Sequence, residues 1–333
     1  MIRTHLVAAI GLLACLAPIA SQAQQPTPVT TLRYGQIAAS AKSISSLPLY
    51  VAQRQGFLAR HGINLDVVPI QGGTHFMLEA LDNGTVDVTY TATPYLVKAA
   101  LAGSDAVAIA GASGNNLYTL IAKPGISSIA DLKDKTVGLS LPVDTITIST
   151  RRLLTKHGLD EGAYRTVELV GTPARTKCLT EGECAAVPLT QPEDFALIAR
   201  GYRRLGDSSE VVPELQFSVL AVKRAWGTAN KDVVVRLVRA FGDAFAFMAD
   251  PKNRAETVAI ISATTSATPE IARQLLTFYY EPDKGVFPRR GEINLKGFAQ
   301  VITFMAEAKE LSAPLSDANR FIDLQHLQAA GLQ

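Results

Sequence analysis

The stretch GTHFMLEALDNGTVD, residues 73–87, decides the fold, because the chain repeats its pattern once. The second copy begins at Gly171-Thr172 and runs on without a gap. The matched positions are Leu81 with Leu179, Gly84 with Gly182, Pro94 with Pro192 and Gly103 with Gly201. A shorter echo precedes each copy, RHGIN at residues 60–64 and KHGLD at residues 156–160. Glycine and proline occur at many α/β turns, but agreement of spacing and residue type over two segments favours a duplication.

A unit that recurs once predicts two similar lobes, since a solenoid needs at least about three repeats. Apolar strand patterns alternate with helical ones, which is typical of α/β lobes with mostly parallel sheets. We predict a first lobe from residues 31–120 and 217–333 and a second from residues 121–216. The chain then crosses between them near residues 117–123 and 213–219, and two crossover strands form a hinge. A cleft between such lobes is a place for a small molecule.

The C-terminal third follows a different pattern. Helices are predicted over residues 233–248, 254–262, 269–277 and 295–308, and no third sheet is expected. We expect these helices to pack back on the first lobe.

Residues 1–23 have the features of an export signal. A positively charged start (MIRTH) precedes an apolar run over residues 6–17, which Pro18 interrupts. Small residues at Ser21 and Ala23 fit a signal peptidase site, so residues 24–30 form a loose tail of the mature chain. The apolar run is shorter than the about 20 residues that span a bilayer. We therefore expect a periplasmic protein that does not insert into the membrane once the signal is removed.

The composition is that of an ordinary globular protein, with 47% hydrophobic and 19% charged residues. The formal net charge is +2, and it falls to +1 when Arg3 leaves with the signal. Nucleic acid is an unlikely partner for so neutral a chain, because phosphate binding needs a concentrated basic face. No cofactor motif is found, and we expect a monomer.

Two cysteines, Cys178 and Cys184, remain after Cys15 leaves with the signal. A lower-ranked alternative takes residues 12–15 (LLAC) as a lipoprotein cleavage site, which would leave an unusually short apolar segment. The repeat places Cys178 late in a helix and Cys184 early in the next strand, so the turn between them brings the two close. An even count in an exported chain favours a disulfide. Metal binding is not expected, since no His or third Cys stands nearby.

An ordered series of short motifs resembles the substrate-binding proteins of bacterial ABC importers. These are the sulfonate/nitrate/taurine-type proteins, the SsuA/THI5-like group, which share their fold with thiamine-precursor synthases. The motifs are LRYG (32–35), LPLYVA (47–52), QGFL (55–58), HGINL (61–65), GG (72–73), ALDNGTVD (80–87), ADLKDK (130–135) and AAVPLTQP (185–192). The resemblance implies a type II periplasmic-binding-protein fold that closes on its ligand and docks on the importer's transmembrane subunits. The second copy has CAA at residues 184–186 where the first has VDV at residues 86–88, and the family often keeps an acid at this turn. The cysteine pair suggests a subgroup whose ligand the resemblance does not name.

Ligands of open α/β sheets bind beyond the carboxyl ends of the strands, beside helix N-termini. Applied to both lobes and the hinge, this rule gives a set of candidate ligand-binding residues. They are Ser43, Ser45, Ser46, Gly72, Gly73, Thr74, Thr91, Thr93, Asn115, Asn116, Asp144, Thr145, Thr190 and Gln191.

Several of these residues have a purely structural alternative. Ser45 and Ser46 can cap a helix, Gly72 and Gly73 can make only a turn, and Asp144 can cap its own helix. Outside the set, His75 is expected on the surface of its helix, and Tyr118 in the core of the hinge.

Exposed helix N-termini favour an anionic ligand. Lys42 is the one cation expected near these loops, and Asp144 opposes a doubly charged anion. The residues therefore permit an organic acid, a sulfonate, or a neutral or aromatic solute, and the family resemblance favours an organic anion.

We expect a non-enzymatic binding protein with no catalytic residues. An enzyme of the same fold is a weaker alternative, because the synthases carry a clustered-cysteine metal motif and a cytosolic address that this chain lacks. A ligand-loaded partner of a membrane sensor is a third possibility.

Overall fold

A computed structural model of the protein describes residues 29–115, 117–212, 214–280 and 286–333. The predicted signal, most of the predicted tail and Asn116 lie outside these residues. Within them, no helix combines the length and the hydropathy that a membrane span requires.

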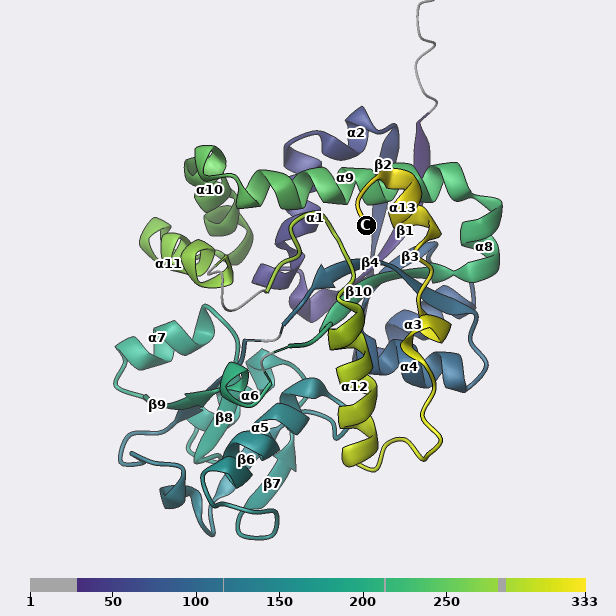
Figure 1. Ribbon diagram of the computed structural model, residues 1–333. Helices are drawn as coiled ribbons and strands as arrows, with labels where there is room; N and C mark the ends of the chain where they lie inside the picture. The colour runs from purple at the N-terminus through teal and green to yellow at the C-terminus, as the bar shows by residue number, and fades with distance from the viewer. Residues whose placement is uncertain (1–28, 116, 213, 281–285) are drawn as a thin grey trace, which may run out of the picture.

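Each lobe is built on a five-stranded sheet (Figure 1). In spatial order, the strands of the first sheet are β2 (Ile63–Ile70), β1 (Thr30–Ile37), β3 (Val88–Ala92), β10 (Ser218–Lys223) and β4 (Ala106–Ser113). Those of the second are β7 (Arg165–Glu168), β6 (Thr136–Leu139), β8 (Ala186–Leu189), β5 (Thr119–Ala122) and β9 (Arg203–Asp207). In both sheets the first three strands are parallel and the fourth is antiparallel to its neighbours. The sheets correspond strand by strand, as a duplication predicts, and the two-lobed, mostly parallel α/β fold is confirmed.

Helices cover both faces of each sheet. Those that pack on the first sheet or extend from it are α1 (Leu47–Arg54), α2 (Phe57–Arg60), α3 (His75–Asp82), α4 (Thr93–Leu101), α8 (Arg224–Ala229), α9 (Lys231–Ala249), α10 (Arg254–Thr265), α11 (Pro269–Tyr279), α12 (Leu295–Glu307) and α13 (Gln325–Ala330). Those of the second lobe are α5 (Thr145–Lys156), α6 (Thr172–Thr180) and α7 (Glu193–Ala199). Short 3₁₀ turns lie at Ala38–Ser40, Ile44–Ser46, Ala130–Leu132, Ser208–Glu210, Pro251–Asn253 and Ala318–Phe321.

The repeated segment forms the same local structure twice. Helices α3 and α6 each end before a glycine in the left-handed conformation, with φ of 76° at Gly84 and 83° at Gly182. No atom lies within 4 Å of where a Cβ would stand at either position. The backbone conformation and not the available space therefore selects glycine here, as at many helix C-termini.

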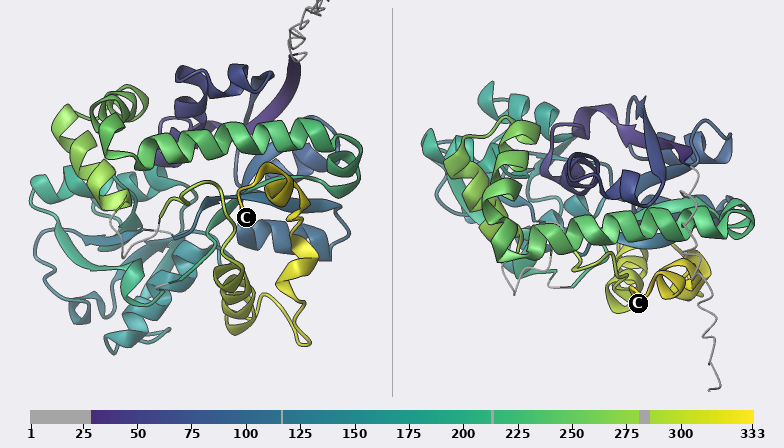
Figure 2. Two further views of the ribbon diagram at one scale, coloured as in Figure 1. Left: turned by 45° about the horizontal axis from the view of Figure 1, so that its top comes forward. Right: turned by 90° about the horizontal axis from the view of Figure 1, so that it is seen from above.

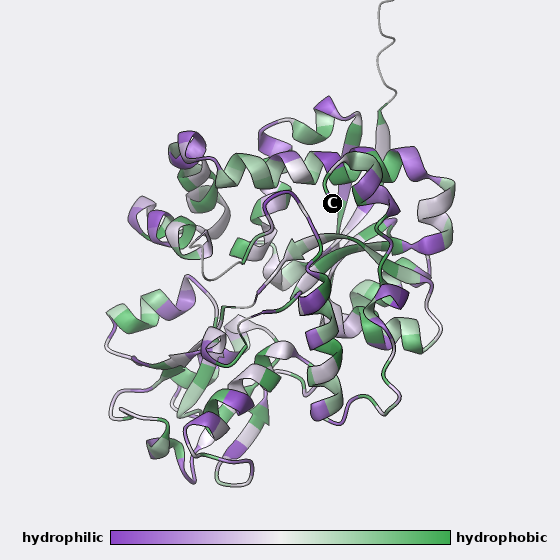
Figure 3. Cartoon of the chain, viewed as in Figure 1, coloured by the Kyte–Doolittle hydropathy of each residue, from purple (hydrophilic) through white to green (hydrophobic). Residues whose placement is uncertain are grey.

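Apolar residues concentrate in the strands and on one face of most helices (Figure 3). The long helix α9 lies across the first lobe (Figure 2), where Phe241 stacks on Tyr34 of β1 with ring centroids 6.2 Å apart. The second lobe has a smaller core on each side of its sheet, one around Leu154 of α5 and one around Leu179 of α6.

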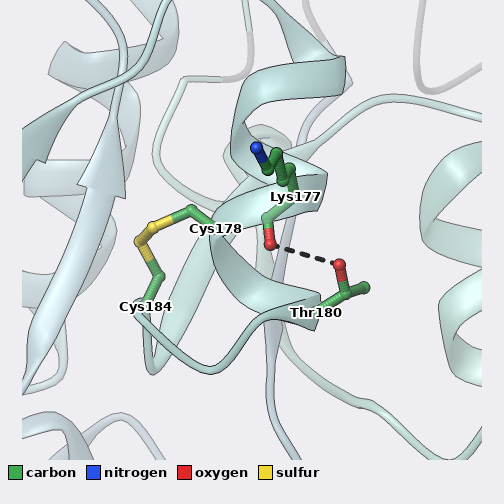
Figure 4. The surroundings of a disulfide bond; sticks show 4 residues. All are labelled: Lys177, Cys178, Thr180 and Cys184. Atoms are coloured by element: carbon green, nitrogen blue, oxygen red, sulfur yellow. Dashed lines mark hydrogen bonds between the residues drawn. A yellow bond between two sulfur atoms is a disulfide. The ribbon is translucent and has the colours of Figure 1, made fainter.

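The predicted disulfide is confirmed. Cys178 near the end of α6 bonds Cys184 just before β8, with the two Cα atoms 5.3 Å apart (Figure 4). Both cysteine side chains are buried in the core around Leu179 of α6. The bridge closes the helix-to-strand corner that the first copy of the repeat makes without one.

The C-terminal helices pack largely on the first lobe, and two of them also contact the second lobe. Helix α12 reaches α5 of the second lobe, where Glu307 accepts a 2.5 Å bond from Arg152. On the other side of the molecule, Phe278 of α11 meets Phe195 of α7 edge to face, with ring centroids 6.0 Å apart. Both helices therefore contact the second lobe as well.

The two crossings between the sheets lie side by side. The first follows β4 and the second precedes β10, and the Phe217 amide donates to the Ser113 carbonyl at 3.0 Å. Thr119 already pairs with strands of the second sheet, so the predicted lobe boundary at residue 120 falls inside β5.

Candidate functional site

A cleft of about 610 Å³ lies between the lobes, and both lobes contribute to its walls. Strand ends and helix N-termini from the two copies of the repeat face each other across it. The predicted residues that line it are Ser43, Ser45, Gly72, Gly73, Thr74, Asn115, Asp144, Thr145 and Thr190. Their contact with a solute stays a prediction.

Two threonines of the first lobe do not line the cleft. Thr91 is fully buried inside the sheet, while its neighbours Tyr90 and Ala92 face the cleft, because successive residues of a strand point to opposite sides. The Thr93 hydroxyl is also buried and donates to the Gln216 carbonyl at 2.6 Å.

Ser46 and Gln191 are placed near the cleft but not on its walls. Ser46 is buried, and its hydroxyl donates to the Ser40 carbonyl at 2.8 Å instead of capping α1. Gln191 is buried too, and its amide donates to Asp194 at 2.8 Å.

In the first lobe, hydroxyls and glycines form much of the wall. The Ser43 hydroxyl donates to the Ser40 carbonyl at 2.8 Å and lies 2.5 Å from the hydroxyl of Ser45. Gly72 has φ of 89°, and a Cβ there would stand 2.6 Å from the Phe76 ring. His75 is exposed as expected, yet it also lines the cleft.

Arg175 of α6 lines the cleft and is not among the residues predicted from the sequence. Its side chain is only 3% exposed and donates to the carbonyls of Pro188 at 2.8 Å and Leu169 at 3.1 Å. A third, longer bond of 3.3 Å reaches the Thr172 hydroxyl. Burial lowers the pKa of Arg175, and nearby Tyr118 and Asp144 act in the opposite direction. These bonds hold a positive charge beside the cleft.

A signal for Arg175 was present in the repeat. The equivalent position in the first copy is Met77, which is fully buried. A charged residue in place of a core methionine indicates a local function, since an unpaired buried charge destabilises a protein.

Asp144 stands at the start of α5 and lines the cleft beside Tyr95 of the first lobe. Its side chain makes no capping hydrogen bond to the helix, so the capping alternative is wrong. It accepts a hydrogen bond from the Ser140 hydroxyl. Burial raises the pKa of the Asp144 carboxyl, and hydrogen bonds from Ser140 and Tyr95 partly oppose that rise.

Aromatic side chains supply most of the apolar wall. Tyr118 meets Phe217 edge to face, with ring centroids 6.1 Å apart, and Tyr279 lies 5.3 Å from Phe287 by the same measure. All four line the cleft, together with Tyr90. Tyr118 is therefore a wall residue as well as a hinge residue, and burial raises the pKa of its hydroxyl.

Tyr279 also ties the two lobes together at the cleft. Its hydroxyl donates to the side-chain carbonyl of Gln191 at 3.1 Å. Gln191 and Thr119 both donate to Asp194 at 2.8 Å, so a chain of hydrogen bonds runs from α11 into the second sheet. Burial raises the pKa of Asp194, while the bonds from Gln191 and Thr119 lower it.

The arrangement offers a small molecule a charged group, hydrogen-bonding groups and aromatic rings. Within the described parts of the chain, no group of three or more His, Cys, Asp and Glu side chains is placed to hold a metal ion. Lys42, the cation expected near the site, is not among the lining residues.

The family model described as NMT1/THI5 like matches residues 43–255. A search of curated proteins found no match. The fold is similar to that of the periplasmic aliphatic sulphonate binding protein SsuA from Escherichia coli, with a TM-score of 0.68 and 20% identity over 88% of this chain and 92% of that one. It is also similar to the periplasmic nitrate-binding protein NrtA from Synechocystis PCC 6803, with a TM-score of 0.73 and 15% identity over 91% and 88% of the two chains. The desulfurization enzyme DSZB matches with a TM-score of 0.64 and 16% identity over 90% and 98%.

Proposed function

Because the chain belongs to the NMT1/THI5-like family, we propose that it is an extracytoplasmic solute-binding protein of an ABC import system. In this proposal it captures a small organic anion in the interlobe cleft and delivers it to the transmembrane subunits of the importer. The predicted export signal supports a periplasmic location. The similarity to sulphonate- and nitrate-binding proteins supports the fold that such a receptor uses.

The observation that carries the proposal is the buried guanidinium of Arg175 at the cleft. Among the described residues, no carboxylate lies within ion-pairing distance of it. Asp144 and Glu193 act on the guanidinium only from beyond that distance. A buried charge without a direct partner is costly, and an anionic solute would supply that partner. The guanidinium fork suits a carboxylate or a sulfonate, which can accept two hydrogen bonds at once.

Closure of the lobes would provide the affinity without chemistry on the solute. The paired crossings form a hinge, and the Tyr279–Gln191 bond joins the lobes beside the cleft. Expulsion of water strengthens the charge interactions that remain inside.

A thermal-shift panel tests the proposal on the full chain exported by a bacterial host. The panel holds sulfonates, carboxylates, aromatic acids, amines and pyrimidines. At a hundredfold excess over Kd, a true ligand raises the free energy of unfolding by about 2.7 kcal/mol. If no class of compound in the panel raises the free energy of unfolding, the proposal is abandoned.

Two further measurements separate the alternatives. Consumption of a stabilising solute would favour an enzyme, a reading that the match to DSZB keeps open. Fractionation and N-terminal sequencing test the export signal, and a mature chain that starts at Gln24 is expected.

A further inference from the structure

The cleft contains two charges of opposite sign that do not pair with each other. Arg175 and Asp144 both line it and both come from the second lobe; they attract each other, but among the described residues they are too far apart to form an ion pair. Carbonyls and the Thr172 hydroxyl accept hydrogen bonds from Arg175, whereas the Ser140 hydroxyl donates to Asp144, and Tyr95 lies beside that carboxyl.

Both charged groups keep hydrogen-bonding capacity for a ligand. A guanidinium has five N–H donors, and three of those of Arg175 serve the protein. An ionised carboxylate has about four acceptor sites, so Asp144 can take a further donor beside Ser140 and Tyr95. A solute that satisfies both groups needs an acceptor with negative charge and, elsewhere on its frame, a hydrogen-bond donor.

The wall of the cleft favours a flat apolar frame. Tyr118 with Phe217 and Tyr279 with Phe287 present two aromatic pairs to the same space, and Tyr90 adds a fifth ring. Aromatic side chains attract a ring in edge-to-face or offset contact beyond the effect of buried area alone.

We propose, resting on the proposed function, that the cleft selects aromatic acids that carry a hydroxyl or amino group. The carboxylate binds Arg175, the hydroxyl or amino group donates to Asp144, and the ring lies against the tyrosine and phenylalanine pairs. Asp144 also rejects dianions, since a second negative charge near it is repelled in a site that excludes water. An aromatic acid that lacks the donor leaves the Asp144 carboxylate desolvated without a hydrogen bond from the ligand, and this lowers the affinity of that acid.

Isothermal titration of the full chain with matched probes tests the proposal. The probes are benzoate, 4-hydroxybenzoate, 4-aminobenzoate, terephthalate, cyclohexanecarboxylate and an alkanesulfonate. We expect 4-hydroxybenzoate or 4-aminobenzoate to bind about 10- to 100-fold more tightly than benzoate, and terephthalate to bind more weakly than either.

The variant Asp144→Ala should abolish that preference, because benzoate then no longer leaves a buried carboxylate without a partner and gains affinity relative to the two donor-carrying probes. Asp160→Ala, an exposed acid of the same lobe, is the matched control and should keep the preference. If Asp144→Ala does not fold, Asp144→Asn removes the charge at nearly constant shape, and the preference for the amino probe should fall.

The outcomes separate this inference from the proposed function. Tight binding of an alkanesulfonate without any aromatic acid would overturn the ligand class but leave a solute-binding protein. An unchanged preference in Asp144→Ala would overturn the role of Asp144. A panel in which nothing binds would remove both proposals.

Discussion

Replacement of Arg175 by methionine tests how the cleft holds an anion. Methionine is what the first copy of the repeat carries at this position, where Met77 is fully buried, so the change restores the internal pattern. It removes a charge that is 3% exposed, together with its bonds to the carbonyls of Pro188 and Leu169. Loss of one partner of a buried, hydrogen-bonded charge pair costs about 2–5 kcal/mol, or roughly 30- to 4,000-fold in Kd.

The stability of the empty protein should change far less than the affinity. Two carbonyls lose a donor, which costs about 1–3 kcal/mol each if they find no other partner. Removal of a desolvated charge acts in the opposite direction, and burial does lower the pKa of Arg175. We therefore expect the two effects largely to cancel, so that Arg175→Met folds and melts near the wild-type temperature.

Titration calorimetry with an anionic hit from the panel gives the readout. Lys177→Met is the matched control, since it removes the same charge from the same helix at a side chain that is 72% exposed. Its affinity should stay within about twofold. Arg175→Lys keeps the charge but loses the planar fork, and we expect an intermediate affinity. An Arg175→Met protein that is folded and binds the anion as well as Lys177→Met does would refute the assignment.

Three further predictions concern the bridge, the interlobe bond and the buried acid. Replacement of Cys178 and Cys184 by serine should lower the free energy of unfolding by about 2 kcal/mol in urea titrations and leave the cleft affinity unchanged; lost binding would contradict this. Tyr279→Phe removes the bond to Gln191 and should raise the solute off-rate about 2- to 10-fold in stopped-flow experiments; an unchanged off-rate counts against a role in closure. The folded-state pKa of Asp144 lies above its ordinary value of 3.8. Ionisation of this carboxyl therefore lowers the free energy of unfolding as the pH rises from 3.8 through the raised pKa, and it has no effect on stability below 3.8. Asp144→Asn should therefore melt higher than wild type at pH 7, with a gap that closes in acid; a gap independent of pH would disprove this.

Much of the architecture follows from short-range patterns in the chain. The repeat predicts two lobes because each copy carries its own helix, left-handed glycine and strand, and these form locally. Cys178 and Cys184 are likewise close because one turn separates them. The strand-end rule placed most of the predicted site residues on the cleft wall, since it depends only on where each strand stops.

Tertiary structure alone decided what the cleft presents. Strand alternation separates Thr91 from Tyr90, but only the packing of helices on the sheet determines which of them faces the second lobe. Tyr279 and Phe287 follow the second lobe by many residues, and the fold brings them back to the hinge. Arg175 follows the repeat in position and departs from it in chemistry. Its hydrogen bonds are to nearby residues of the second lobe, and only the packed fold shows that it is buried and lines the cleft. Local propensity acts over a few residues, whereas burial and charge pairing depend on every element that packs around a side chain.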